Sequence, residues 1–210
     1  MTGFATVDDL GGFAQSNPDI VSLDAFVIDV NGNAIGKRVP MSDAPKVFKS
    51  GVAFSACAPL LDCRGRGHDA GGRGASDGDP DGIALPLAGT LARVPWAKTP
   101  TAQVMCVMRE YGTQEALWFD QRVVLQEIIA RCRAHGLNAV IACELEFYLV
   151  DSARAQQGQL RIAANPRTGS APSRPANLSL ESIEDQSTFL SQIETAAQAQ
   201  GIPLGSAVSE

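Results

Sequence analysis

The chain has little of several features that mark common classes of protein. Its 210 residues contain no run of about 20 apolar residues, the length that crosses a bilayer as a helix, so the sequence predicts no membrane partner. The first 18 residues show neither the basic nor the apolar region of a secretory signal. Seventeen basic residues stand against 23 acidic ones, and the net charge of −6 disfavours nucleic acid as a partner. We therefore expect a cytoplasmic protein.

Cysteine and histidine are too few and too scattered for a disulfide framework or a zinc site. The five cysteines are an odd number, and none of them forms a Cys-x-x-Cys pair. Several stand in apolar runs, which favours buried, reduced thiols in a cytosolic protein. The two histidines, His68 and His135, fall in a glycine-rich loop and at a predicted helix end. Both are expected at the surface.

Short apolar stretches bounded by turn residues predict a β-rich first half. Val21–Val30 is followed by Asn31-Gly32, a hairpin signal because both residues tolerate positive φ, and Ala34–Val39 is the return strand. Residues 64–82 are rich in Gly, Asp and Arg and are predicted to form a loop. Further strands are predicted at residues 52–54, 83–85, 91–94 and 102–108.

The second half changes to a mixture of helices and strands. Asp120 is placed to cap a helix that ends at Gly136, and a second helix is predicted from about Asp185 to Gln200. Residues 152–179 are polar, contain three prolines and form a long excursion. Strands are predicted at residues 139–150 and from Ala207 to Glu210.

Two carboxylates stand at positions i and i+2 inside the apolar run 139–150, in the segment Glu144-Leu-Glu-Phe-Tyr-Leu149. In a strand both would lie on one face, because successive side chains alternate between faces. Two like charges side by side favour a hard divalent cation such as Mg²⁺ or Mn²⁺. The alternative is a half-exposed strand whose glutamates simply meet water.

Several segments together resemble the glutamine synthetase family, especially its branch that joins glutamate to amines (the γ-glutamylpolyamine synthetase type). They occur in the family's order over nearly the whole chain, and their combination is far more specific than any one of them. The matching segments are Asp29–Pro40, Gly78–Gly82, Val94–Ala97, Asp120–Gly136, Glu144–Leu149, Gly201–Pro203 and Val208–Glu210.

The resemblance implies an α+β fold with two domains. Residues 1–17 would be an N-terminal extension, residues 18–110 a β-grasp domain, and residues 111–210 an incomplete catalytic α/β domain of the glutamine synthetase type. It also implies an ATP-dependent ligase that needs Mg²⁺ or Mn²⁺ and joins glutamate to ammonia or an amine through γ-glutamyl phosphate. ATP would be a co-substrate, and the full-length protein would be a homo-oligomer.

Three glutamates are implied as metal ligands. Glu144 would help to hold the ion at the nucleotide phosphates, and Glu146 would help to hold the ion near the γ-carboxylate of glutamate, joined there by Glu210. Such ions neutralise phosphate charge and align the acceptor oxygen. The resemblance identifies no catalytic side chain and no nucleotide-binding residue in this chain.

The chain also departs from the family's pattern. Neither histidine matches the family's metal-binding histidine, and the region 55–62 lacks the usual Phe-Asp-Gly-Ser, so Asp62 is either the aspartate that reaches a neighbouring active site or a plain loop residue. Trp96 is expected to pack against other side chains. Family members continue beyond Glu210, so we expect this chain alone to be inactive. The alternative is a truncated, non-catalytic remnant that still contacts family subunits.

Overall fold

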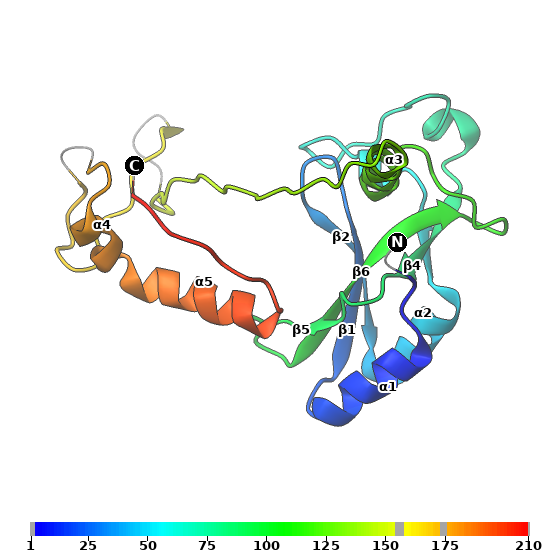
Figure 1. The fold of residues 1–210 in the computed structure, drawn as a ribbon, viewed down its shortest axis with the longest axis horizontal. Helices are drawn as coiled ribbons and strands as arrows, with labels where there is room; N and C mark the ends of the chain where they lie inside the picture. The colour runs from blue at the N-terminus through cyan, green and yellow to red at the C-terminus, as the bar shows by residue number, and fades with distance from the viewer. Residues whose placement is uncertain (1–2, 154–157, 173–175, 210) are drawn as a thin grey trace. The chain divides into compact units, whose positions relative to one another are not determined.

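The computed structural model describes residues 3–153, 158–172 and 176–209. The chain divides into two compact units, Met1–Ala139 and Val140–Glu210, and each is described here by itself (Figure 1). Over the described ranges, no helix combines the length and the apolar character needed to cross a membrane. The predicted boundary near residue 110 concerns family domains and stays a prediction.

The first unit is built on a mixed sheet with the strand order β2-β1-β6-β4-β3, to which β5 adds by pairing with β6. Strands β1 and β6 run parallel, and the other pairs are antiparallel. All the strands lie close to predicted ones. Their bounds are Ser22–Ile28 (β1), Ala34–Pro40 (β2), Val52–Ser55 (β3), Asp81–Pro86 (β4), Ala92–Arg93 (β5) and Thr101–Glu110 (β6).

The predicted hairpin between β1 and β2 is confirmed, with Ile28 opposite Ala34. The buried Asp29 carboxylate accepts hydrogen bonds from the backbone N–H groups of Asn31 and Asn33, each at 2.8 Å. Gly32 supplies the positive φ of 81° that the turn requires. The turn is therefore fixed by its own side chains.

Helices α1 (Val7–Ser16) and α2 (Ala44–Ser50) of this unit were not predicted from the sequence. Helix α1 begins with a capping box: the Thr6 hydroxyl accepts from the backbone N–H of Asp9 at 3.2 Å, and the Asp9 carboxylate accepts from that of Thr6 at 2.7 Å. The apolar core holds Leu10 of α1, Val47 and Phe48 of α2, and alternate strand residues such as Val27 and Val104. One face of the sheet is thereby buried.

The other face of the sheet is covered at one end by α3 (Gln121–Ala134), where Val123 packs with Leu87 and Val107. The predicted cap at Asp120 is confirmed and does more than cap. One of its oxygens accepts from the backbone of Arg122 at 2.8 Å, and the other accepts from the N–H of Met108 in β6 at 2.9 Å. Asp120 therefore joins the start of the helix to the sheet.

The glycine-rich segment before β4 lacks long strands, as predicted for residues 64–82, but it is tied to the sheet. Arg73 forms ion pairs with Asp77, at 2.8 Å, and with Glu110 at the end of β6. Short 3₁₀ turns lie at Met41–Asp43, Ala58–Leu60 and Ala75–Asp77. The two ion pairs of Arg73 thus hold the loop before β4 against the end of β6.

The second unit contains α4 (Leu180–Asp185) and α5 (Ser187–Ala199), and α5 confirms the helix predicted near Asp185–Gln200. Ser179 caps α4 by accepting from the backbone of Ser182 at 3.2 Å. None of this unit's described residues is buried. Its helices are therefore formed chiefly by local hydrogen bonds.

Candidate functional site

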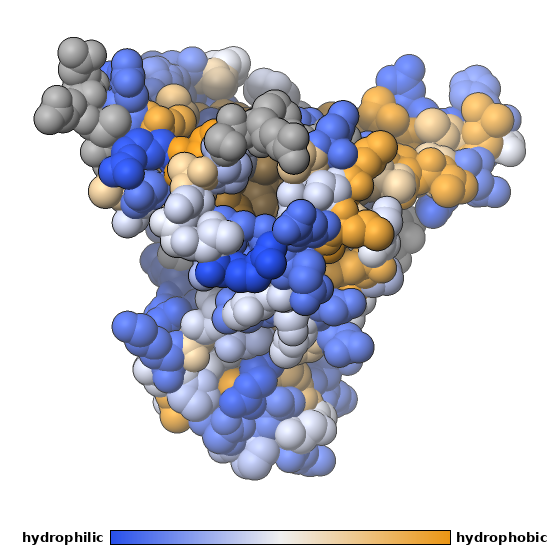
Figure 2. All heavy atoms as spheres, turned by 90° about the vertical axis from the view of Figure 1, so that its left-hand side faces the viewer, coloured by the Kyte–Doolittle hydropathy of each residue, from blue (hydrophilic) through white to orange (hydrophobic). Residues whose placement is uncertain are grey.

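The prediction of a paired strand at residues 139–150 is wrong. The segment around Glu144 and Glu146 belongs to no sheet in the described structure, and both glutamates are exposed. Exposed apolar side chains appear as orange patches in Figure 2, and among the largest exposed fractions are those of Val140 (96%) and Leu145 (84%). The run is apolar, but it is not buried here.

The physical reason is that a strand needs a partner. Only the end of the run is paired, where Val150 forms an isolated bridge with Ile162 and Ala163 donates to the carbonyl of Leu149 at 3.0 Å. Upstream of Leu149 the described residues place no second strand alongside, so the backbone groups gain no ladder. Alternating composition alone cannot supply that partner.

Glu210 lies outside the described residues, so its place beside the other two glutamates stays a prediction. The described part of the strand predicted at 207–210 is not a strand either, which corrects that prediction as well. Ser209 instead bonds to a turn, accepting from the N–H of Leu178 at 2.6 Å and donating its hydroxyl to the carbonyl of Ala176 at 3.2 Å. These two bonds of Ser209 take the place of the backbone hydrogen bonds that a strand would make with a neighbouring strand.

Glu144 and Glu146 nevertheless suit a divalent ion chemically. Across the described ranges neither carboxylate has a hydrogen bond or an ion pair, so both keep their oxygens available as ligands. No group of three or more His, Cys, Asp or Glu side chains within these ranges is arranged to hold a metal ion. A complete site would need further ligands beyond this pair.

The carboxylate segment is connected to helix α5 through an aromatic contact. The rings of Phe147 and Phe189 meet edge to face, with centroids 6.0 Å apart. Phe147 follows Glu146 directly, so this contact holds the segment where the two glutamates lie. It is the one aromatic pair in the described part of residues 140–210.

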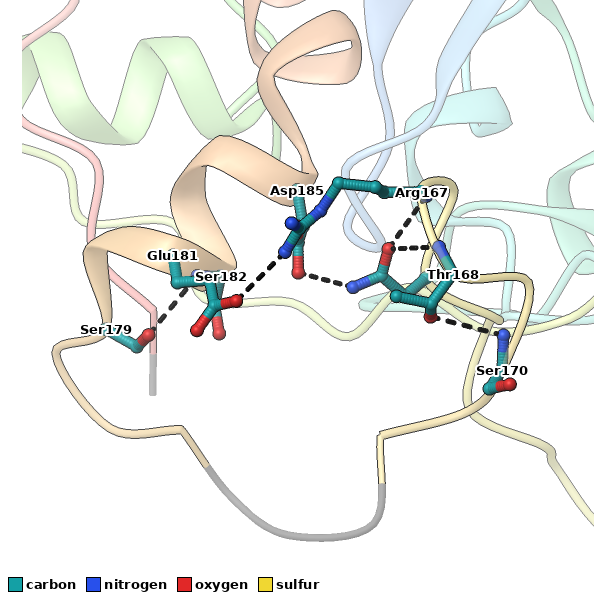
Figure 3. A network of polar contacts seen from close by, with 8 residues as sticks. Arg167, Thr168, Ser170, Ser179, Glu181, Ser182 and Asp185 are labelled. Atoms are coloured by element: carbon teal, nitrogen blue, oxygen red, sulfur yellow. Dashed lines mark hydrogen bonds and ion pairs between the residues drawn. The ribbon is translucent and has the colours of Figure 1, made fainter.

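A polar network fixes the excursion between the glutamate segment and the helices (Figure 3). Arg167 donates to Asp185 at 2.6 Å and to Glu181 at 3.0 Å, and Asn165 also donates to Asp185. Arg167 thereby holds the pKa of the Asp185 carboxyl below its ordinary value. This network was not predicted from the sequence, although Asn165-Pro-Arg-Thr-Gly169 is a recognisable turn sequence.

Asp62 lies in a tight loop whose polar groups it organises. Its carboxylate accepts from the backbone N–H groups of Arg64 and Arg66, at 2.8 and 2.9 Å, and lies 3.0 Å from Nε2 of His68. The His68 contact, followed by these backbone bonds, lowers the pKa of Asp62. His68 and His135 are both exposed, as predicted.

Comparison with known proteins identifies the second half of the chain. Residues 119–210 match the model of the glutamine synthetase catalytic domain. The chain is 31% identical over 212 aligned residues to the gamma-glutamylputrescine synthetase PuuA of Escherichia coli strain K12. That alignment covers 99% of this chain and 44% of PuuA, so the chain spans less than half the length of this curated relative.

Solved structures agree on the fold. A crystal structure described as a novel glutamine synthase homolog has a TM-score of 0.61 at 14% identity, covering 91% of this chain and 41% of that one. A GmaS/ADP complex has a TM-score of 0.60 at 14% identity, covering 94% and 39%. The resemblance seen in the sequence is thus confirmed: residues 119–210 match the glutamine synthetase catalytic domain, and the chain is similar along its length to a gamma-glutamylputrescine synthetase.

Proposed function

We propose that this chain is the N-terminal part of an ATP-dependent ligase that joins glutamate to ammonia or an amine. The observation that carries the proposal is the 31% identity to a gamma-glutamylputrescine synthetase along 99% of this chain. An amine is favoured as the second substrate, because that relative's name specifies putrescine. Within this reaction, ATP would phosphorylate the side-chain carboxylate of glutamate, and the amine would then displace the phosphate.

The metal ligands in this proposal are Glu144, Glu146 and Glu210. The first two have exposed carboxylates with no partner in the described ranges, and such oxygens are what Mg²⁺ and Mn²⁺ prefer. A bound divalent ion would neutralise phosphate charge during the transfer. Glu144 would act on the nucleotide side and Glu146 on the glutamate side, with Glu210 beside Glu146.

The proposal also includes the finer fold and the assembly. Residues 18–110, which contain the mixed sheet, would be the family's β-grasp domain, and residues 111–210 would belong to the catalytic domain. The complete protein would act as a cytoplasmic homo-oligomer. All five cysteines are free, which suits a reducing compartment.

The decisive experiment uses the full-length product of the gene that encodes this chain. ADP release is measured with glutamate plus ammonia, putrescine or no amine, after removal of the host's glutamine synthetase. We expect amine-dependent turnover that Glu146→Gln lowers by at least about 100-fold, because a metal ligand is lost. The matched control is Glu194→Gln, an exposed glutamate of α5 that should leave turnover unchanged. Turnover that depends on neither ammonia nor putrescine would contradict the proposal.

The metal pair can be tested on the 210-residue chain itself. Electron paramagnetic resonance of Mn²⁺ reports the bound ion without requiring activity. We expect weak binding that Glu144→Gln or Glu146→Gln each reduces, whereas Glu194→Gln does not. The chain alone should give no glutamate-dependent ADP release, because catalysis depends on many groups positioned together. Equal Mn²⁺ binding in all four proteins would remove Glu144 and Glu146 from the site.

A further inference from the structure

The second face of the sheet is only half covered. Helix α3 packs over the end of β6 at Met105 and Val107, while Phe26 and Gln103 at the other end stay half-exposed. A hollow of ≈ 630 Å³ lies over this open end. Its floor is formed by β1, β2 and β6, and the loop after β5, residues 94–99, forms its wall. This volume matches that of ordinary small-molecule sites.

The wall of the hollow is fixed by hydrogen bonds. Val94 is buried and donates its N–H to the carbonyl of Thr101 at 2.9 Å, and Ala97 closes a turn on the carbonyl of Val94 at 3.2 Å. The hydroxyl of Thr101 donates to the carbonyl of Thr99 at 2.8 Å. These bonds lie on both sides of Trp96 and Lys98, so the backbone that carries both side chains is held in place.

Trp96 is exposed where the sequence analysis expected it to pack. Its exposed fraction is 65%, so that expectation is wrong for the described chain. An exposed indole leaves a large apolar surface in water and is a frequent anchor for ligands. With Phe26 on the floor, the hollow offers two aromatic surfaces to a flat molecule.

The hollow is lined by three basic residues, Lys37, Arg38 and Lys98. The Nζ of Lys37 donates to the backbone carbonyl of Ala53 at 2.6 Å, which leaves Lys98 as the lysine with a free ammonium group in the described structure. Arg38 is already engaged by Asp24, with its Nε and Nη2 donating to the two carboxylate oxygens at 2.6 and 2.7 Å, and this pair is neutral. Lys98 is exposed, and the described residues offer it no hydrogen-bond or ion-pair partner. An uncompensated cation therefore stands beside Trp96, in a chain whose net charge is −6.

We propose that this hollow is a binding site for a small aromatic carboxylate, whose ring lies against Trp96 and Phe26 and whose carboxylate pairs with Lys98. The free side-chain amide of Gln103, which has no partner in the described ranges, adds a hydrogen-bonding group on the floor. The site is formed by the sheet and does not involve the glutamate segment, so it is independent of the proposed ligase chemistry.

The test compares two probes that differ in charge. Isothermal titration calorimetry on the 210-residue chain is carried out with 2-naphthoate and with naphthalene-2-methanol, its uncharged counterpart. We expect 2-naphthoate to bind about fivefold or more tightly than the alcohol, with added salt reducing the difference, as for an exposed ion pair. In parallel, the indole N–H signal of Trp96, assigned with Trp96→Phe, should shift on titration.

Variants then identify the groups. Lys98→Ala should abolish the preference for the carboxylate, and Trp96→Ala should weaken both probes about tenfold through loss of ring contact. The matched controls are Lys49→Ala, an exposed lysine of α2, and Trp118→Phe, the other tryptophan, which packs on Phe119. Neither control should change binding.

Several results would overturn the proposal. One is equal binding of the two probes. Another is a shift of the indole N–H signal of Trp118 instead of that of Trp96. The third is no saturable binding of 2-naphthoate up to about 10 mM, a limit weaker than most specific affinities. Circular dichroism checks that each variant keeps the fold. If a variant loses the fold, the proposal is still tested by the comparison of the two probes on the unaltered chain and by the shift of the Trp96 indole N–H signal.

Discussion

Residues 1–139 contain every buried side chain of the described structure, whereas residues 140–210 contain none that is described. In the first unit, strands distant in sequence pair side by side, as Ser22 does with Thr101, and helices α1 and α2 close over one face. In the second, hydrogen bonds within α4 and α5, a cap at Ser179 and the Arg167 network provide the order. The first unit is stabilised by burial, and the second by local polar contacts.

The comparison shows that the two kinds of element depend differently on the rest of the chain. A helix satisfies most of its backbone groups internally, so α5 forms with no buried residue among those described. A strand has no internal partners, and the run around Glu144 stays unpaired in spite of its apolar composition. Sequence patterns predicted both the helix α5 and a strand around Glu144, but only the helix forms in the described structure.

The largest expected difference between the units is in their resistance to proteolysis. Under native conditions thermolysin should cut first near Leu145, Phe147 and Tyr148, and a fragment close to residues 1–139 should survive. Local opening costs little where few groups are buried, so we expect rates that differ by about 100-fold or more. Mass spectrometry of timed samples measures this. Equal resistance of both units would contradict the comparison.

A core substitution sharpens the comparison through the free energy of unfolding. Leu23 is 0% exposed in β1, and Leu23→Ala should destabilise the chain by about 3 kcal/mol because it leaves a cavity. The matched change in the second unit is Leu145→Ala, where the side chain is 84% exposed and the loss should be under about 0.5 kcal/mol. Urea unfolding followed by circular dichroism measures both. Similar losses would mean that Leu145 is buried in solution.

The two helix caps give a smaller contrast. Asp120→Ala removes the acceptor for Met108 in β6 as well as the cap of α3, and should cost about 2 kcal/mol because buried N–H groups lose their partner. Ser179→Ala removes a single bond at a half-buried helix end, where water can reach the freed N–H, and should cost about 0.5 kcal/mol. The same urea experiment compares them, and equal costs would refute a double role for Asp120.

The smallest expected effect is a dependence of the second unit on pH. The Arg167 hydrogen bond lowers the pKa of Asp185, so the folded carboxyl releases its proton more readily than the unfolded one. The contribution of this pair is therefore present above the ordinary aspartate pKa, about 3.9, and is lost as the pH falls through the lowered value.

That loss can be followed with the Arg167 Nε–H signal in an NMR titration from about pH 6 to pH 2, spanning the ordinary aspartate pKa. The signal should move as Asp185 takes up its proton. In Arg167→Gln the carboxyl of Asp185 should titrate closer to its ordinary value. An Asp185 pKa that is the same in both proteins would show that Arg167 does not hold the carboxylate in solution.

Much of the fold was predictable from the sequence, because the signals concerned are local. Asn31-Gly32 identified the hairpin, Asp120 and Gly136 bounded α3, and the spacing of apolar residues identified α5. Three helices were not predicted, and α4 is one of them, a six-residue helix just before the predicted one. Helix α2 is only seven residues long, and α1 lies in a stretch that was assigned to an N-terminal extension.

The candidate site was less predictable, because it depends on which segments meet. The spacing of Glu144 and Glu146 singled out two carboxylates that have no partner in the described structure, and their role as metal ligands stays a prediction. The spacing did not predict the unpaired backbone that carries them. Asp120 also accepts from the N–H of Met108, which lies on another element. The other end of the sheet, beside Trp96, stays open because α3 buries only Val123, near its start, against the sheet.

Local sequence was enough to specify the turns, the caps, the helices of strong periodicity and the resemblance to glutamine synthetases, since each is carried by residues close together in the chain or by their order along it. Only the tertiary structure decided the pairing of β1 with β6, the burial of Asp120 and the exposure of Trp96 and Leu145. The physical reason is that pairing and burial require two segments to meet, and neither segment alone specifies its partner.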